Sequence, residues 1–147
     1  MGVSILSAAL RIGLAILLAV TAIAKWVDFL AFEDSMRLSQ LFPFSWRHII
    51  ADGIIGLELL LGASLVLQWR KTWPLQAATM LGGLFLGYAV WRFRMGIPSP
   101  CHCLGFLAEL GPVQSIEFAL SFFAASAVAL LLSTATRRPQ MAKGRNK

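Results

Sequence analysis

Four runs of mostly apolar residues, each about as long as a bilayer is thick, constrain this chain more than any other feature. A helix rises about 1.5 Å per residue, so about 20 apolar residues cross the hydrocarbon core of a membrane. The runs are Val3–Ala24, Ile49–Gln68, Pro74–Trp91 and Pro112–Ser133. They predict an all-α integral membrane protein, a four-helix transmembrane bundle that lies in the lipid bilayer.

The composition agrees with a membrane protein of one domain. Of the 147 residues, 58% are hydrophobic and 14% are charged, whereas about 25% are charged in a soluble domain. The net charge of +6 does not indicate binding to nucleic acid, because the basic residues lie at the ends of the apolar runs and in the C-terminal tail. We expect residues 1–135 to form the membrane domain and residues 136–147 to form a basic, disordered cytoplasmic tail.

Four spans would place both termini on the same side of the membrane. Seven lysine and arginine residues fall on that side or in the middle loop beside it, and five fall on the other side. The positive-inside rule assigns the richer side to the cytoplasm. The predicted location is therefore the bacterial cytoplasmic (inner) membrane, with the N and C termini in the cytoplasm and the loop after the third span outside.

That outer loop holds both cysteines of the chain, Cys101 and Cys103, within the sequence Pro-Ser-Pro-Cys-His-Cys-Leu-Gly. Two thiols at this spacing can close a strained disulfide ring, and strain favours thiol/disulfide exchange. His102 could tune the acidity of both thiols by favouring their thiolate forms. Three interpretations are open: a redox-active pair, a structural pair in a membrane scaffold, and a Cu(I) site made of Cys101, His102 and Cys103.

Under the redox interpretation, the chain has one cysteine pair, whereas membrane enzymes that generate disulfides commonly relay electrons between two pairs. We therefore expect a component of thiol/disulfide exchange that works with a separate thioredoxin-like or other extracytoplasmic protein, and is not a complete oxidase. A quinone is the electron acceptor to consider.

The Gly83-x-x-x-Gly87 pair would let another helix approach closely, either within the bundle or across a homo-oligomer.

Glu58 lies at the centre of the second run, where a carboxylate facing lipid would be costly, so it should face the bundle interior. Arg11 is the ninth residue of the first run, and Glu58 lies ten residues from the cytoplasmic end of the second. Their expected depths differ by only ~3 Å. These depths predict an ion pair between Arg11 and Glu58. A second hypothesis makes Glu58 a proton relay for redox chemistry.

Several short sequences together resemble one family of membrane proteins. They are Ala24-Lys25-Trp26-Val27-Asp28, Phe42-Pro43, Gly56-Leu57-Glu58 with Gly62, Arg94-x-Gly96, and Cys101-x-Cys103-Leu104-Gly105. In these sequences the chain resembles the MauE branch of the MauE/DoxX-like membrane proteins, up to about Leu132. His102 stands where the family often has glycine.

The resemblance implies a four-helix protein of the bacterial inner membrane that is associated with redox chemistry. The naming member of the family works with a thioredoxin-like partner to mature the disulfide-rich subunit of methylamine dehydrogenase. Carried to this sequence, the resemblance points to Cys101 and Cys103 as the redox pair and to Glu58 as the buried acid of the family. It also makes methylamine metabolism the expected context.

Overall fold

The computed structural model describes residues 2–39, 43–69, 71–97 and 111–144, and the regular elements of this part of the chain are all helical. The all-α fold class predicted above is therefore confirmed for the described residues. The α-helices are α1 (Gly2–Val27), α2 (Phe29–Ser39), α3 (Arg47–Leu67), α4 (Trp73–Arg94) and α5 (Pro112–Gly144), and a 3-10 turn, η1 (Phe44–Trp46), precedes α3.

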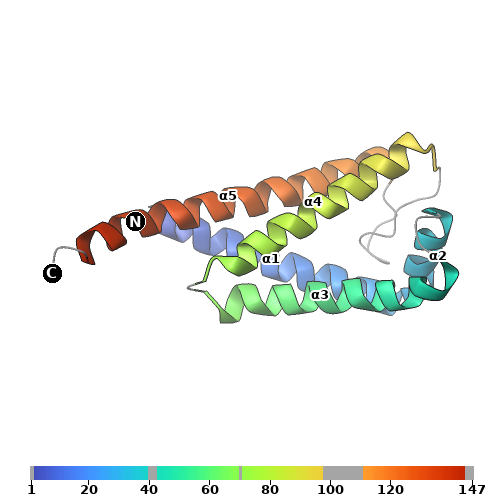
Figure 1. Ribbon diagram of the computed structural model, residues 1–147, viewed down its shortest axis with the longest axis horizontal. Coiled ribbons are helices and arrows are strands. Elements are labelled where there is room, and N and C mark those ends of the chain that lie inside the picture. The colour runs from blue at the N-terminus through green and yellow to red at the C-terminus, as the bar shows by residue number, and fades with distance from the viewer. Residues whose placement is uncertain (1, 40–42, 70, 98–110, 145–147) are drawn as a thin grey trace.

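The four long helices form two antiparallel pairs, α1 with α3 and α4 with α5, as Figure 1 shows. Contacts between α1 and α5 join the two pairs. The short helix α2 lies at the end of the bundle where α1 ends and α3 begins, and it packs on α3. The N and C termini lie together toward the opposite end (Figure 1).

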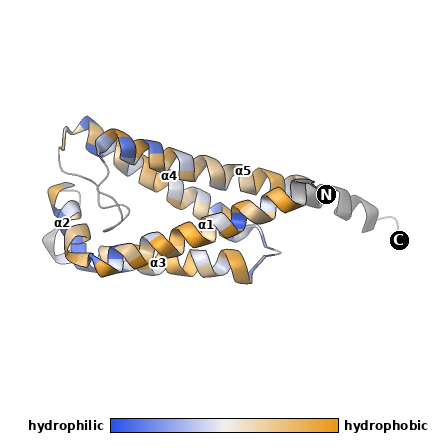
Figure 2. Cartoon of the chain, turned by 180° about the vertical axis from the view of Figure 1, so that it is seen from behind, coloured by the Kyte–Doolittle hydropathy of each residue, from blue (hydrophilic) through white to orange (hydrophobic). Residues whose placement is uncertain are grey.

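Three of the described helices contain segments that are long and apolar enough to cross a membrane: Ile5–Val27, Arg47–Leu67 and Pro112–Ala135. Figure 2 shows hydrophobic residues along most of α1 and α3. Helix α4 has 22 residues but is not among the three, and it includes polar residues such as Gln76 and several glycines. It connects the end of α3 to the opposite end of the bundle, where α5 begins (Figure 1). If α3 and α5 cross a membrane, α4 must cross it too.

Most ends of the observed helices agree with the ends of the predicted spans. The ends of α1, α3 and α4 lie within three residues of the predicted ones, and α5 begins at the predicted Pro112. Helix α5 continues to Gly144, however, which is 11 residues past the predicted end at Ser133. Residues 136–144, which were expected to belong to the tail, continue this helix.

The buried side chains form two clusters. The larger cluster joins all four long helices and contains Leu14, Ala15, Leu18, Leu61, Leu65, Leu75, Leu81, Phe122 and Ala129. The smaller one fixes α2 against α1 and α3 and contains Ala22, Phe32, Met36, Ala51 and Ile55. Several serine and threonine hydroxyl groups on the buried faces donate hydrogen bonds to carbonyl oxygens three residues earlier in the same helix, as Ser64 does to Leu61 and Ser126 to Phe123. These hydroxyls are thereby satisfied without water.

Helices α4 and α5 approach each other closely at Gly82. A Cβ atom at this position would lie 2.8 Å from Cδ1 of Phe122 and 3.1 Å from Cα of Phe123. At Gly83 the nearest such contact is 3.6 Å, and at Gly87 nothing lies within 4 Å. Within the described part of the bundle, Gly82 therefore makes a closer approach than Gly83 or Gly87, and contact of Gly83 and Gly87 across a homo-oligomer stays a prediction.

Candidate functional site

The most unusual feature of the interior is an ion pair between Lys25 of α1 and Glu58 of α3. The Lys25 ammonium donates a hydrogen bond to Oε1 of Glu58, and the two residues are 2% and 0% exposed. Glu58 is the twelfth of the 21 residues of α3, so it lies about 17 Å along the helix from Arg47. The prediction that Glu58 faces the bundle interior is confirmed, and the charge is compensated there by a lysine.

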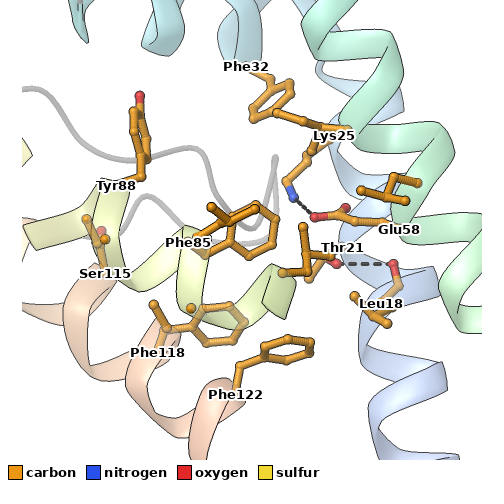
Figure 3. A pocket seen from close by; sticks show the side chains of 18 of the residues that line it. Leu18, Thr21, Lys25, Phe32, Glu58, Phe85, Tyr88, Ser115, Phe118 and Phe122 are labelled. Atoms are coloured by element: carbon orange, nitrogen blue, oxygen red, sulfur yellow. Dashed lines mark hydrogen bonds and ion pairs between the residues drawn. The ribbon is translucent and has the colours of Figure 1, made fainter. Parts of the chain in front are cut away.

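Lys25 also contacts aromatic rings on two further helices. Its ammonium nitrogen lies 5.4 Å from the ring centroid of Phe32 on α2 and 5.1 Å from that of Phe85 on α4. A cation close to the face of an aromatic ring is stabilised by the ring quadrupole, most strongly where water is excluded. One side chain of α1 therefore holds α2, α3 and α4 together, as Figure 3 shows from close by.

The predicted ion pair between Arg11 and Glu58 is wrong. The Arg11 guanidinium donates hydrogen bonds to the carbonyl oxygens of Trp69 (2.8 Å) and Lys71 (2.9 Å), in the turn between α3 and α4. Arg11 is thus level with the end of α3, while Glu58 is level with Lys25. The prediction counted both depths from the cytoplasmic side, and so assumed that the start of α1 is level with the end of α3. The first turns of α1 instead extend past the end of α3.

The ion pair lines a cavity of about 550 Å³ between the two helix pairs. Helix α2 closes one side with Phe32 and Met36, and the remaining walls come from α1, α3, α4 and α5. The lining is almost entirely apolar, with several aromatic rings that include Phe85, Phe118 and Phe122 (Figure 3). A cavity of this size and character is typical of a site for a small molecule.

Two buried polar atoms of the cavity lining have no hydrogen-bond partner among the described residues. They are Oε2 of Glu58 and the hydroxyl of Tyr88. The Thr21 hydroxyl lies beside Glu58 but donates to the carbonyl oxygen of Leu18 (3.1 Å). Buried polar atoms are nearly always paired in proteins. The cavity therefore offers hydrogen-bonding capacity that the described part of the chain does not use.

The other predicted site residues, Cys101, His102 and Cys103, lie outside the described residues. The two ends of their loop are described. After α4, Gly96 has φ +63°, and the amides of Gly96 and Ile97 donate to the carbonyl oxygens of Phe93 (3.1 Å) and Arg92 (3.3 Å). This is a Schellman motif, which ends a helix sharply.

At the other end of the loop, α5 starts with a defined N-terminus. Its first residue is Pro112, and the side-chain oxygen of Gln114 accepts a hydrogen bond from the amide of Gly111 (3.1 Å). A proline at the first helical position and a glutamine that reaches back to the capping residue are both typical helix starts. The end of α4 and the start of α5, which flank the cysteine segment in the sequence, are thus both fixed by hydrogen bonds, at the end of the bundle where α2 lies.

Lys25 was not predicted to be a site residue, because it follows an apolar run as the other flanking basic residues do. A signal for burial exists in the sequence, because Arg11, Leu14, Leu18 and Lys25 follow one face of a helix with spacings of three, four and seven. All four are buried. Tyr88, whose hydroxyl is buried in the cavity lining, has no comparable signal in the sequence.

The fold and the cavity define a class of protein: an all-α membrane bundle with a charged pair inside. The family model described as "Methylamine utilisation protein MauE" matches residues 3–135. The chain belongs to the MauE family, as the resemblance in sequence predicted. The comparisons found no match among the curated proteins and none among the solved structures.

Proposed function

We propose that this protein is a multi-pass protein of the bacterial inner membrane that supports thiol/disulfide redox chemistry in the maturation of an extracytoplasmic partner. Cys101 and Cys103 are the proposed redox pair, and the partner is a thioredoxin-like or other exported redox protein. The observation that carries the proposal is the MauE family match over 133 residues, 3–135, which includes the Cys-x-Cys loop. The name of the family makes methylamine utilisation the proposed context.

The described residues support an exchange site at this loop. Schellman geometry at Gly96 and the capping of Gly111 fix the points at which the loop leaves α4 and enters α5. Both points lie at the end of the bundle away from the termini (Figure 1). With the termini in the cytoplasm, as the distribution of basic residues predicts, the loop faces the compartment in which disulfides persist.

The proposed chemistry is a thiol/disulfide exchange. A thiolate of the pair attacks one sulfur of a partner disulfide, a mixed disulfide forms, and the second partner sulfur leaves as a thiolate. The other cysteine of the pair then displaces the partner, so that the pair is oxidised by two electrons and the partner is reduced by two. In the reverse direction, a partner dithiol is oxidised while the Cys101–Cys103 disulfide is reduced.

The test is thiol trapping in intact cells. Free thiols are quenched with acid and labelled with a maleimide mass tag, with and without prior reduction, and a membrane-impermeant maleimide reports the side of the membrane. We expect an outward-facing pair that is mostly oxidised and is reduced by mild dithiol. The single variants Cys101→Ser and Cys103→Ser should differ, because only one of them should accumulate a mixed disulfide with the partner.

The double variant Cys101→Ser/Cys103→Ser decides between exchange and a scaffold role. Exchange predicts normal amounts of the membrane protein but loss of partner maturation. Normal maturation without either cysteine would contradict the proposal and leave a scaffold with a structural pair. A pair that faces the cytoplasm and stays reduced would contradict it as well. Stoichiometric Cu(I) binding that disappears in the double variant would support metal handling instead.

A further inference from the structure

We propose that the cavity beside Lys25 and Glu58 binds the ring of a membrane quinone. The cavity measures about 550 Å³, within the range of roughly 300–1,000 Å³ of small-molecule sites. This inference goes beyond thiol exchange, because it concerns a different part of the molecule and a different ligand.

The position of the polar groups argues against a phospholipid in the cavity. Glu58 lies about 17 Å along α3 from one end and about 14 Å from the other, so its carboxylate is near the middle of this span, and Lys25 reaches it from the last turn of α1. A phospholipid places its polar headgroup at the membrane surface and its chains deeper in the bilayer. The cavity needs a ligand whose hydrogen-bonding atoms meet the protein at the level of the middle of α3.

The polar atoms match the two oxidation states of a quinone. The Lys25 ammonium can donate a hydrogen bond to a quinone carbonyl. Oε2 of Glu58, which is buried and has no partner among the described residues, can accept one from the hydroxyl of a quinol. Hydrogen bonds to charged groups are about twice as strong as bonds between neutral groups. The Lys25–Glu58 pair can therefore hold either form of the ring.

The apolar lining matches the rest of such a molecule. Phe32, Phe85, Phe118 and Phe122 surround the cavity from α2, α4 and α5 (Figure 3). Aromatic side chains pack on flat rings by offset or edge-to-face contacts. Leu84 and Gly87 of the lining are also exposed on the outside of α4, so the cavity extends to the lipid-facing surface, where a hydrophobic tail would leave it.

A redox step at this site rests on the proposed function, whereas binding does not. In that step Cys101 and Cys103 would lose two electrons and two protons to form their disulfide, and the quinone would gain both to become a quinol. Glu58 would then deliver protons to the ring oxygens, in the relay role considered for it from the sequence.

The experiment measures binding of decylubiquinone to the purified full-length protein in detergent, by quenching of tryptophan fluorescence and by the shift in thermal unfolding temperature. Trp91 lines the cavity, so a bound quinone should quench it. Decylbenzene, which has the same tail and no ring oxygens, controls for partitioning of a hydrocarbon. We expect saturable quenching and a raised unfolding temperature with decylubiquinone, and neither with decylbenzene.

Two variants test where the ring lies. The double variant Lys25→Met/Glu58→Gln keeps the approximate side-chain sizes and removes both charges together, and it should bind about tenfold or more weakly, as expected for one lost hydrogen bond to a charged group. Gly87→Phe should abolish binding by blocking the cavity where it opens at the lipid-facing surface, because Gly87 lines the cavity, is exposed there, and has nothing within 4 Å of an added Cβ. Gly13→Phe is the matched control, because Gly13 is an equally unobstructed helical glycine that does not line the cavity.

Equal stabilisation by both probes, or equal binding by the unmodified protein and Gly87→Phe, would overturn the quinone site. Gly87→Phe keeps the test decisive even if the double variant does not fold. Cys101→Ser/Cys103→Ser separates this proposal from the exchange function. Undiminished binding by that variant would support a quinone site that exists whether or not the cysteines exchange, and loss of binding would contradict it.

Discussion

Lys25 and Glu58 form an ion pair inside the bundle, and both side chains are buried there. Taking two charges out of water is expensive, and their attraction offsets this cost only while both are present. The pair therefore sets the height of α1 against α3, because sliding either helix by one turn would leave two uncompensated charges in an apolar interior.

Removing one member of this pair should be far more harmful than removing both. We expect Lys25→Met and Glu58→Gln each to lower the free energy of unfolding by about 3–5 kcal/mol, as for other broken buried pairs. The double variant should lose much less, because no buried charge remains without a partner. Thermal unfolding of the four proteins in the same detergent gives this double-mutant cycle.

A second cycle is the control. Arg11 contacts the turn between α3 and α4 and is 14 residues, or about 21 Å of helix, away from Lys25. The effects of Arg11→Met and Glu58→Gln should therefore add. A combined loss well below the sum would mean that Arg11 and Glu58 interact after all.

Arg11 should also stabilise the protein in its own right. Its two hydrogen bonds, 2.8 Å to the carbonyl oxygen of Trp69 and 2.9 Å to that of Lys71, hold the turn after α3 against α1. A hydrogen bond to a charged group contributes about 1.5–3 kcal/mol. We expect Arg11→Met to lower the unfolding free energy by about 2–4 kcal/mol. The unfolding free energy of Arg11→Lys should lie between those of the unmodified protein and Arg11→Met, since an ammonium group cannot hold two carbonyl groups in the fixed geometry of a guanidinium.

The fold was largely predictable, because hydrophobic run length alone indicates a membrane helix. Most helix ends were also predictable to within three residues, because the apolar runs stop there, and Pro112 was predicted as the start of α5. The extension of α5 to Gly144 was missed because a polar, basic segment was taken to be disordered. Polar residues can still continue a helix that has already formed.

The candidate site was only half predictable. Burial of Glu58 follows from its position in an apolar run, but its partner depends on the register of α1 against α3, which no count along either helix determines. Lys25 directly follows the predicted first span, Val3–Ala24, and lies two residues before the end of α1 at Val27. Its position suggested the membrane surface. Helix α2, which folds against α3 and covers this end, places it in the interior instead.

Gly82 and Gly83 provide a matched pair of substitutions at the contact between α4 and α5. Gly82→Ala would place a Cβ 2.8 Å from the Phe122 ring and 3.1 Å from the backbone of Phe123, so that one helix must move. Overpacking of this kind costs about 1–3 kcal/mol. Gly83→Ala meets the Phe123 ring at 3.6 Å, an ordinary contact, and should gain up to about 1 kcal/mol from helix propensity. We expect Gly82→Ala to lower the unfolding temperature and Gly83→Ala to raise it. Equal changes in the two variants would contradict the close approach at Gly82.

The end of α4 offers a test of how the cysteine loop is held. Gly96 has φ +63°, a conformation that costs a residue with a Cβ about 1–2 kcal/mol, and its amide and that of Ile97 close the Schellman motif. We expect Gly96→Ala to lower the unfolding free energy by about 1 kcal/mol. Gly96→Asn should cost less, because asparagine tolerates this conformation.

If the motif also positions the loop for exchange, Gly96→Ala should slow reaction of the cysteines with a partner disulfide more than Gly96→Asn does. Equal stability and equal rates for both variants would mean that the turn at Gly96 matters neither for the end of α4 nor for the loop.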